Sequence, residues 1–103
     1  MKRLILILPR PLRETITDLL AAAPELAWFT VLTAEGHGPR CAEDGTRLPL
    51  DEVLGYVPCT RIEVLLDRDH IKPLLKRLSA EIGQESRHQV RHYVTDIEEF
   101  GHL

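Results

Sequence analysis

The sequence predicts one α+β domain over residues 1–103, on three observations. Four segments are rich in the apolar, aromatic or β-branched residues that strands favour. Two further segments repeat apolar residues every three or four positions, as amphipathic helices do. The chain is 103 residues long, which suits a single hydrophobic core.

The first two elements are predicted to be a strand and a helix. Residues 4–8, LILIL, are apolar at every position, which is typical of a strand covered on both faces. The helix begins near Pro11, because proline is tolerated in a first turn, and Pro24 ends it. Its apolar positions recur at helical spacing: Leu12, Ile16, Leu19, Leu20 and Ala23.

The second and third strands are predicted in the segments LAWFTVLTAE, residues 26–35, and TRIEVLL, residues 60–66. The stretch from 33 to 59 that joins them is long, polar and rich in turn residues. It occupies about a quarter of the chain, so a function for it is expected.

A second helix and a last strand complete the pattern. Asp67 or Asp69 is the expected N-cap of the helix, and Gly83 supplies its stop. The last strand is expected from about His88 to Ile97. The order β-α-β-β-α-β is that of the ferredoxin-like sandwich, an antiparallel sheet with two helices on one face. The helix has one apolar stripe: Ile71, Leu74, Leu75, Leu78 and Ile82.

The first strand also predicts self-association. Its leucines point to one face of the sheet, whereas Ile5 and Ile7 point to the other. Two helices can cover only one face, and large exposed apolar patches are rare on monomers. Copies of the chain are therefore expected to cover the second face, as a homo-oligomer.

Composition excludes several classes of function. Thirteen Lys and Arg stand against sixteen Asp and Glu, so the chain has no basic field for nucleic acid. No apolar run approaches the roughly 20 residues that a membrane helix requires. The run from Leu4 to Leu8 is too short for a signal peptide, and two cysteines are too few for a secreted disulfide scaffold. A cytoplasmic protein is expected.

Three stretches resemble the PII-like (nitrogen regulatory protein P-II-like) signalling superfamily. EGHGPR, residues 35–40, is similar to the family's Gly-Phe-Gly-Arg-Gln, and PCTRIEVLL, residues 58–66, to its Pro-Lys-x-Lys-Ile-Glu-Val-Val-Val strand. RHYV, residues 91–94, looks like its Lys-Ile-Phe-Val. The resemblance implies a trimer with a long T-loop between the second and third strands. In the family, ligands bind at the clefts between subunits.

LAWFT, GHG and EEFGHL resemble, more narrowly, a PII-like group that is often encoded beside heavy-metal efflux pumps. This implies a regulator that contacts a membrane transporter through its T-loop, recruited to the inner membrane face. The residues that the resemblance assigns to effector binding are Gly36, His37, Gly38, Arg40, Glu63 and Arg91. The turn before the last strand, IGQESRHQ, departs from the glycine-rich phosphate loop of nucleotide-binding members.

Histidines and cysteines suggest two further hypotheses. His37 and Cys41 are the best local pair of metal ligands, and Cys41 with Cys59 would close the loop as a redox-sensitive disulfide. Their alternatives are a loop histidine in water and ordinary free thiols. His88 and His92 lie about 13 Å apart on a strand, too far for one ion, and His92 is expected to be an interior histidine.

Catalysis is not expected, because a nucleophile and base would have to come from one loop. The first interpretation is a trimeric PII-like regulator of a transporter, with heavy-metal efflux as the process. One alternative is a direct metal-binding tolerance protein of the same fold. The other is a regulator that responds to an adenine nucleotide or bicarbonate. A divalent metal ion or an adenine nucleotide is thus the expected ligand.

Overall fold

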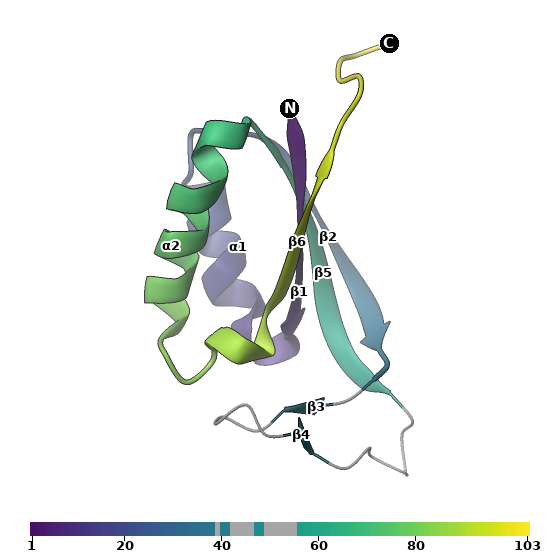
Figure 1. Ribbon diagram of the computed structural model, residues 1–103, viewed down its shortest axis with the longest axis vertical. Coiled ribbons are helices and arrows are strands. Elements are labelled where there is room, and N and C mark those ends of the chain that lie inside the picture. Colours follow the sequence, from purple (N-terminus) through teal and green to yellow (C-terminus); the bar gives the residue numbers. More distant parts are fainter. Residues whose placement is uncertain (39, 42–46, 49–55) are drawn as a thin grey trace.

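The computed structural model describes residues 1–38, 40–41, 47–48 and 56–103, with the side chains of residues 40, 41, 47 and 48 left out. Four long strands form one antiparallel sheet in the order β2-β5-β1-β6, and two helices lie against one face of it (Figure 1). The small α+β fold expected from the sequence is therefore confirmed.

The strands are β1 (Lys2–Pro9), β2 (Leu26–Gly36), β3 (Arg40–Cys41), β4 (Arg47–Leu48), β5 (Val57–Leu66) and β6 (Arg91–Asp96). The helices are α1 (Arg13–Ala21) and α2 (Ile71–Ile82), with 3-10 turns η1 (Arg10–Leu12), η2 (Arg68–His70) and η3 (Arg87–Gln89).

The hydrophobic core lies between the sheet and the helices. Leu4 of β1 is opposite Val64 of β5 and Val94 of β6, so the three strands turn these positions to the same face. Leu74 of α2 is fully buried against this layer. The buried cluster comprises Leu4, Leu6, Leu8, Ile16, Leu20, Ile62, Val64, Leu66, Ile71, Leu74 and Leu78.

Both helices begin through a 3-10 turn. Pro11 lies in the turn before α1, where its missing N–H costs no helical hydrogen bond. Asp67 precedes η2, but its side chain makes no capping hydrogen bond, and His70 occupies the N-cap position of α2. The expected side-chain cap of α2 is therefore not formed, because the 3-10 turn η2 lies between Asp67 and the first residue of α2. Gly83 ends α2 at a φ of 82°, as a glycine stop requires.

The last strand is shorter than expected. Residues 87–89 form the 3-10 turn η3, in which the amide of Val90 donates to the carbonyl oxygen of Arg87 at 3.2 Å. β6 begins only at Arg91 and lies at an edge of the sheet. His92 is exposed there, so the expectation of an interior histidine is wrong. An edge position leaves even the helix-facing side of β6 open to water.

The face of the sheet opposite the helices, called the open face below, carries both apolar and charged side chains. Trp28 is 65% exposed on it, opposite Leu65, and Tyr93 is 46% exposed, opposite Ile5. Ile5 itself is 0% exposed within a single chain. Arg3 lies beside it and hydrogen-bonds across the sheet, so long neighbouring side chains shield this isoleucine without a partner subunit.

Candidate functional site

The sheet brings the two ends of the long connection between β2 and β5 together. The two strands pair over their whole length, up to Gly36 opposite Val57. The connection therefore leaves and re-enters the sheet at neighbouring positions, at the end of the molecule where β3 and β4 lie (Figure 1). We call residues 35–38 and 56–59 the loop base.

His37 is the polar centre of the loop base. Its Nε2 lies 3.5 Å from Oε2 of Glu35, and both side chains are exposed. Its ring lies 5.9 Å from the ring of Tyr56, at an interplanar angle of 41°. A protonated imidazole would pair with the carboxylate, and a neutral one leaves a nitrogen lone pair for a metal or a donor. The tyrosine contact links the two ends of the connection through side chains.

The two glycines of the loop base differ in what they require. Gly38 has a φ of 130°, a conformation that residues with a Cβ rarely adopt. Gly36 has no positive φ, and a Cβ there would meet the carbonyl oxygen of Val57 at 3.4 Å and Sγ of Cys59 at 3.5 Å. These are ordinary contacts, so only Gly38 shows the backbone freedom expected of the Gly-His-Gly motif.

Cys59 is buried and carries a free thiol next to Gly36. The side chain of Cys41 lies outside the described part of the chain, as does that of Arg40. The proposed redox pair and the His37–Cys41 metal pair therefore fall outside what the structure describes.

Glu63 does not join the loop base within one chain. Glu63 is opposite Ile5, six residues along β5 from Val57, which corresponds to about 20 Å. Its Oε1 accepts a hydrogen bond from Nη1 of Arg3 at 3.4 Å. Arg91 is opposite Ile7 on β1, also on the open face. Among the described ligand residues, Gly36, His37 and Gly38 thus lie at the loop base, and strand register places Glu63 and Arg91 on the open face.

Arg3 connects three strands on the open face. Its Nε donates to Oγ1 of Thr95 on β6 at 3.1 Å, and its Nη1 donates to Glu63 on β5. Neither contact was expected, because no local pattern relates residues so distant in sequence. The only signal was the alternation of each strand, which puts Arg3, Glu63 and Thr95 on one face once the register is known.

Arg61 is a second functional candidate that the sequence did not single out. It lies on β5 between Leu32 of β2 and Ile7 of β1. Its Nε is buried and has no hydrogen-bond partner among the described residues. An unsatisfied buried guanidinium nitrogen is costly, so an additional acceptor is expected there.

No group of three or more His, Cys, Asp or Glu side chains in the part of the chain that the structure describes is arranged to hold an ion. The helices in the same part are also too short or too polar to span a membrane.

Comparison with known proteins identifies the family. A search of curated proteins finds no match. Among solved structures, the chain is similar to the crystal structure of a DUF3240 family protein from Shewanella baltica OS155 at 2.40 Å resolution, with a TM-score of 0.74 and 19% identity. The similarity covers 99% of this chain and 94% of the other, which establishes a shared fold. All of residues 1–103 match the family model described as "Protein of unknown function (DUF3240)", and the chain therefore belongs to the DUF3240 family.

Proposed function

We propose that this chain is a PII-like regulatory protein, a ferredoxin-like homotrimer that senses a small effector and controls a membrane transporter. Heavy-metal efflux is the proposed process, and the cytoplasmic face of the membrane is the proposed location. The long elements follow one another as β-α-β-β-α-β, which supports the ferredoxin-like assignment. The exposed Trp28 and Tyr93 support an assembly of copies through the open face.

The observation that carries the proposal is the construction of the loop base. The paired ends of β2 and β5 fix both ends of a long polar connection, and the ring contact between His37 and Tyr56 joins them. A ligand that binds His37 would change this contact and with it the conformation of the connection. Ordering or release of such a segment is an established way to transmit ligand binding to a partner protein.

The choice of transporter rests on the sequence. The Gly-His-Gly motif at residues 36–38 and the EEFGHL segment at residues 98–103 resemble PII-like proteins encoded beside heavy-metal efflux pumps. Imidazole is a common ligand of zinc, copper and nickel, so a divalent metal is the first effector to test at His37. Adenine nucleotides are the second.

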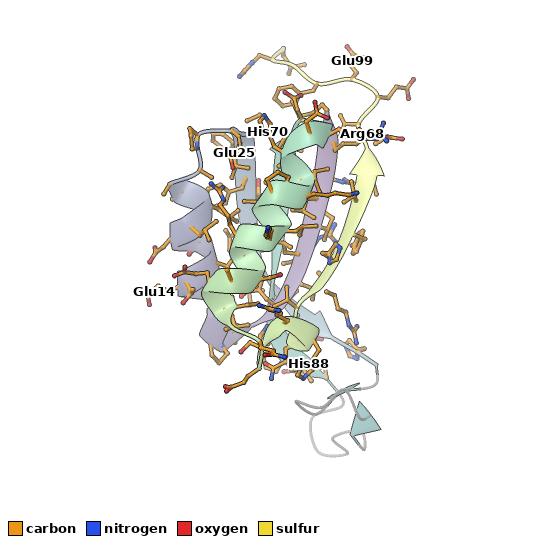
Figure 2. The ribbon with its side chains drawn as sticks, turned by 60° about the vertical axis from the view of Figure 1, so that its left-hand side comes forward. Glu14, Glu25, Arg68, His70, His88 and Glu99 are labelled. Atoms are coloured by element: carbon orange, nitrogen blue, oxygen red, sulfur yellow. The ribbon has the colours of Figure 1, made fainter. Side chains whose placement is uncertain are left out.

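Calorimetric titration tests the effector. Purified protein is titrated with Zn²⁺, Cu²⁺, ATP, ADP and AMP, and compared with His37→Ala and with His70→Ala. His70 is an exposed histidine on η2, next to α2 and away from the loop base (Figure 2). We expect one ligand to bind wild type and His70→Ala alike, and to bind His37→Ala at least about tenfold more weakly, a loss of about 1.4 kcal/mol.

Two results would contradict the proposal. Equal binding by His37→Ala and wild type would remove the loop base from the effector site. Binding of none of the five ligands would leave the effector role without support. The assembly is tested separately, because light scattering that gives the mass of one chain at all concentrations would exclude the homotrimer.

A further inference from the structure

The open face differs in charge from the rest of the molecule. The chain as a whole has a formal charge of −3. Strand register places Arg3, Arg61 and Arg91 on the open face, with Glu63 as the one carboxylate among its paired positions. Arg91 has an interaction of its own within the chain, so Arg3 and Arg61 against Glu63 leave a formal excess of one positive charge. This charge lies beside the exposed apolar side chains of Trp28, Leu32 and Tyr93.

This charge creates a problem for a homotrimer that buries the open face. Copies of a cationic face brought together would repel one another, and burial in a medium of low dielectric strengthens that repulsion. Arg61 also makes no ion pair with a residue that the structure describes. An assembly through this face therefore needs carboxylates from elsewhere.

Residues 98–103, called the tail, have the complementary chemistry. Glu98 and Glu99 are exposed, and neither makes an ion pair with a residue that the structure describes. Phe100 is 47% exposed. The tail extends beyond the end of the sheet and does not fold back over the open face (Figure 1). Glu99 lies at the end of the molecule opposite the loop base (Figure 2).

We propose that the tail of one copy lies across the open face of a second copy. In this arrangement the carboxylates of Glu98 and Glu99 compensate the positive charge of the Arg61 guanidinium, and Phe100 covers apolar surface near Leu32. Arg61 and Leu32 are directly opposite each other on β5 and β2, so one short segment meets both. The inference rests on the homotrimer of the proposed function, and it names the interface.

The lengths are compatible with this arrangement. Trp28 lies four residues from Leu32 along β2, which corresponds to about 13 Å. The four residues that follow Glu99 span up to about 14 Å when extended. A tail anchored at Arg61 therefore reaches Trp28, which is the one tryptophan of the chain and so a specific reporter of the open face.

The first test removes the tail charges. Wild type is compared with a Glu98→Gln/Glu99→Gln variant by light scattering over a concentration series, and by acrylamide quenching of Trp28 fluorescence. We expect the midpoint concentration for association to rise roughly 2- to 30-fold and the Trp28 quenching constant to increase. The matched control is Glu81→Gln/Glu85→Gln, which removes two exposed acids from the end of α2 and the turn after it, and should behave as wild type.

The second test exchanges the charges. A Glu98→Arg/Glu99→Arg variant should associate more weakly than the Gln variant, and adding Arg61→Glu to it should restore part of the association. A folded triple variant without any restoration would exclude Arg61 as the partner. If Arg61→Glu prevents folding, the Gln variant and its Trp28 signal still decide, because exposed tail residues do not support the core.

The outcomes separate this inference from the proposed function. Association and Trp28 quenching that are identical in wild type and the Gln variant would overturn tail docking and leave the homotrimer standing. Monomeric wild type would overturn both the homotrimer and tail docking. Effector binding at His37 is measured separately, by calorimetry.

Discussion

Gly38 is the residue whose backbone most restricts the sequence of the loop base. Its φ of 130° is unfavourable for any residue with a Cβ. We expect Gly38→Ala to lower the free energy of unfolding by about 1–3 kcal/mol. Gly36→Ala is the control and should cost less, because its Cβ meets only ordinary contacts. Urea unfolding measures both, and equal losses would contradict the assignment.

Asp96 gives a pH-dependent contribution to stability. The Nζ of Lys2 donates a hydrogen bond to its carboxylate, and this bond and the lysine charge hold the pKa of Asp96 below its usual value of 3.8. Since the pKa is lower in the folded chain, the contribution is present above about pH 4 and is lost as pH falls through the folded pKa. Asp96→Asn should therefore be less stable than wild type at pH 7 and equal to it in strong acid.

Urea titrations of wild type and Asp96→Asn at pH 7 and at successive values below 4 measure this difference. Asp18→Asn, at an exposed position of α1, is the control and should show little difference from wild type at either pH. A stability difference for Asp96→Asn that stays constant into strong acid would show that the asparagine acts through something other than the ion pair.

Single residues were predictable only where local geometry decides their role. The positive φ of Gly38 follows from the turn that ends a strand, so the Gly-His-Gly motif pointed to it. The exposure of His92 depends on β6 being an edge strand, which no residue near His92 encodes. The separation of Glu63 from His37 likewise depends on how far Glu63 lies along β5 from the loop base. A short family motif contains no information on that distance.

At the scale of elements, two neighbouring leucines of α2 differ in how deeply they are buried. Leu74 is fully buried beneath the helix, whereas the neighbouring Leu75 is half-buried. We expect Leu74→Ala to lower the free energy of unfolding by about 2–5 kcal/mol and Leu75→Ala to cost clearly less. Urea unfolding provides both values, and a cost for Leu75→Ala equal to that for Leu74→Ala would show that the helix is rotated from its described position.

The long elements were predictable because burial imposes a period on the sequence. The all-apolar Leu4–Leu8 run gives β1, and the stripe of α2 gives its helix and its buried face. The 3-10 turn at Arg87–Gln89 was missed, since a single turn is too short to establish a period. The expected aspartate cap was wrong for a related reason, because η2 displaced the start of α2.

At the scale of the whole molecule, the two faces of the sheet were predictable to different degrees. The helix-covered face follows from the leucines of β1 and the stripes of both helices. The open face was expected to be apolar. In the assembled sheet, however, Arg3 of β1 hydrogen-bonds to residues of β5 and β6, and Ile5 is buried within one chain. The exposed apolar residues lie on β2 and β6, the two edge strands, so self-association now depends on Trp28 and Tyr93 more than on Ile5.

Because β2 and β5 pair up to Gly36 and Val57, the sheet should not require the connection for its stability. Replacing residues 39–55 with about four Gly and Ser residues shortens the loop roughly fourfold, which lowers its closure entropy and should raise the free energy of unfolding by about 1 kcal/mol. Circular dichroism and urea unfolding measure the fold, and light scattering measures the assembly. The shortened protein should keep both and lose contact with its transporter in a membrane-binding assay. Loss of the fold itself would show that the connection stabilises the domain, and would remove the reason to regard it as a partner-binding segment.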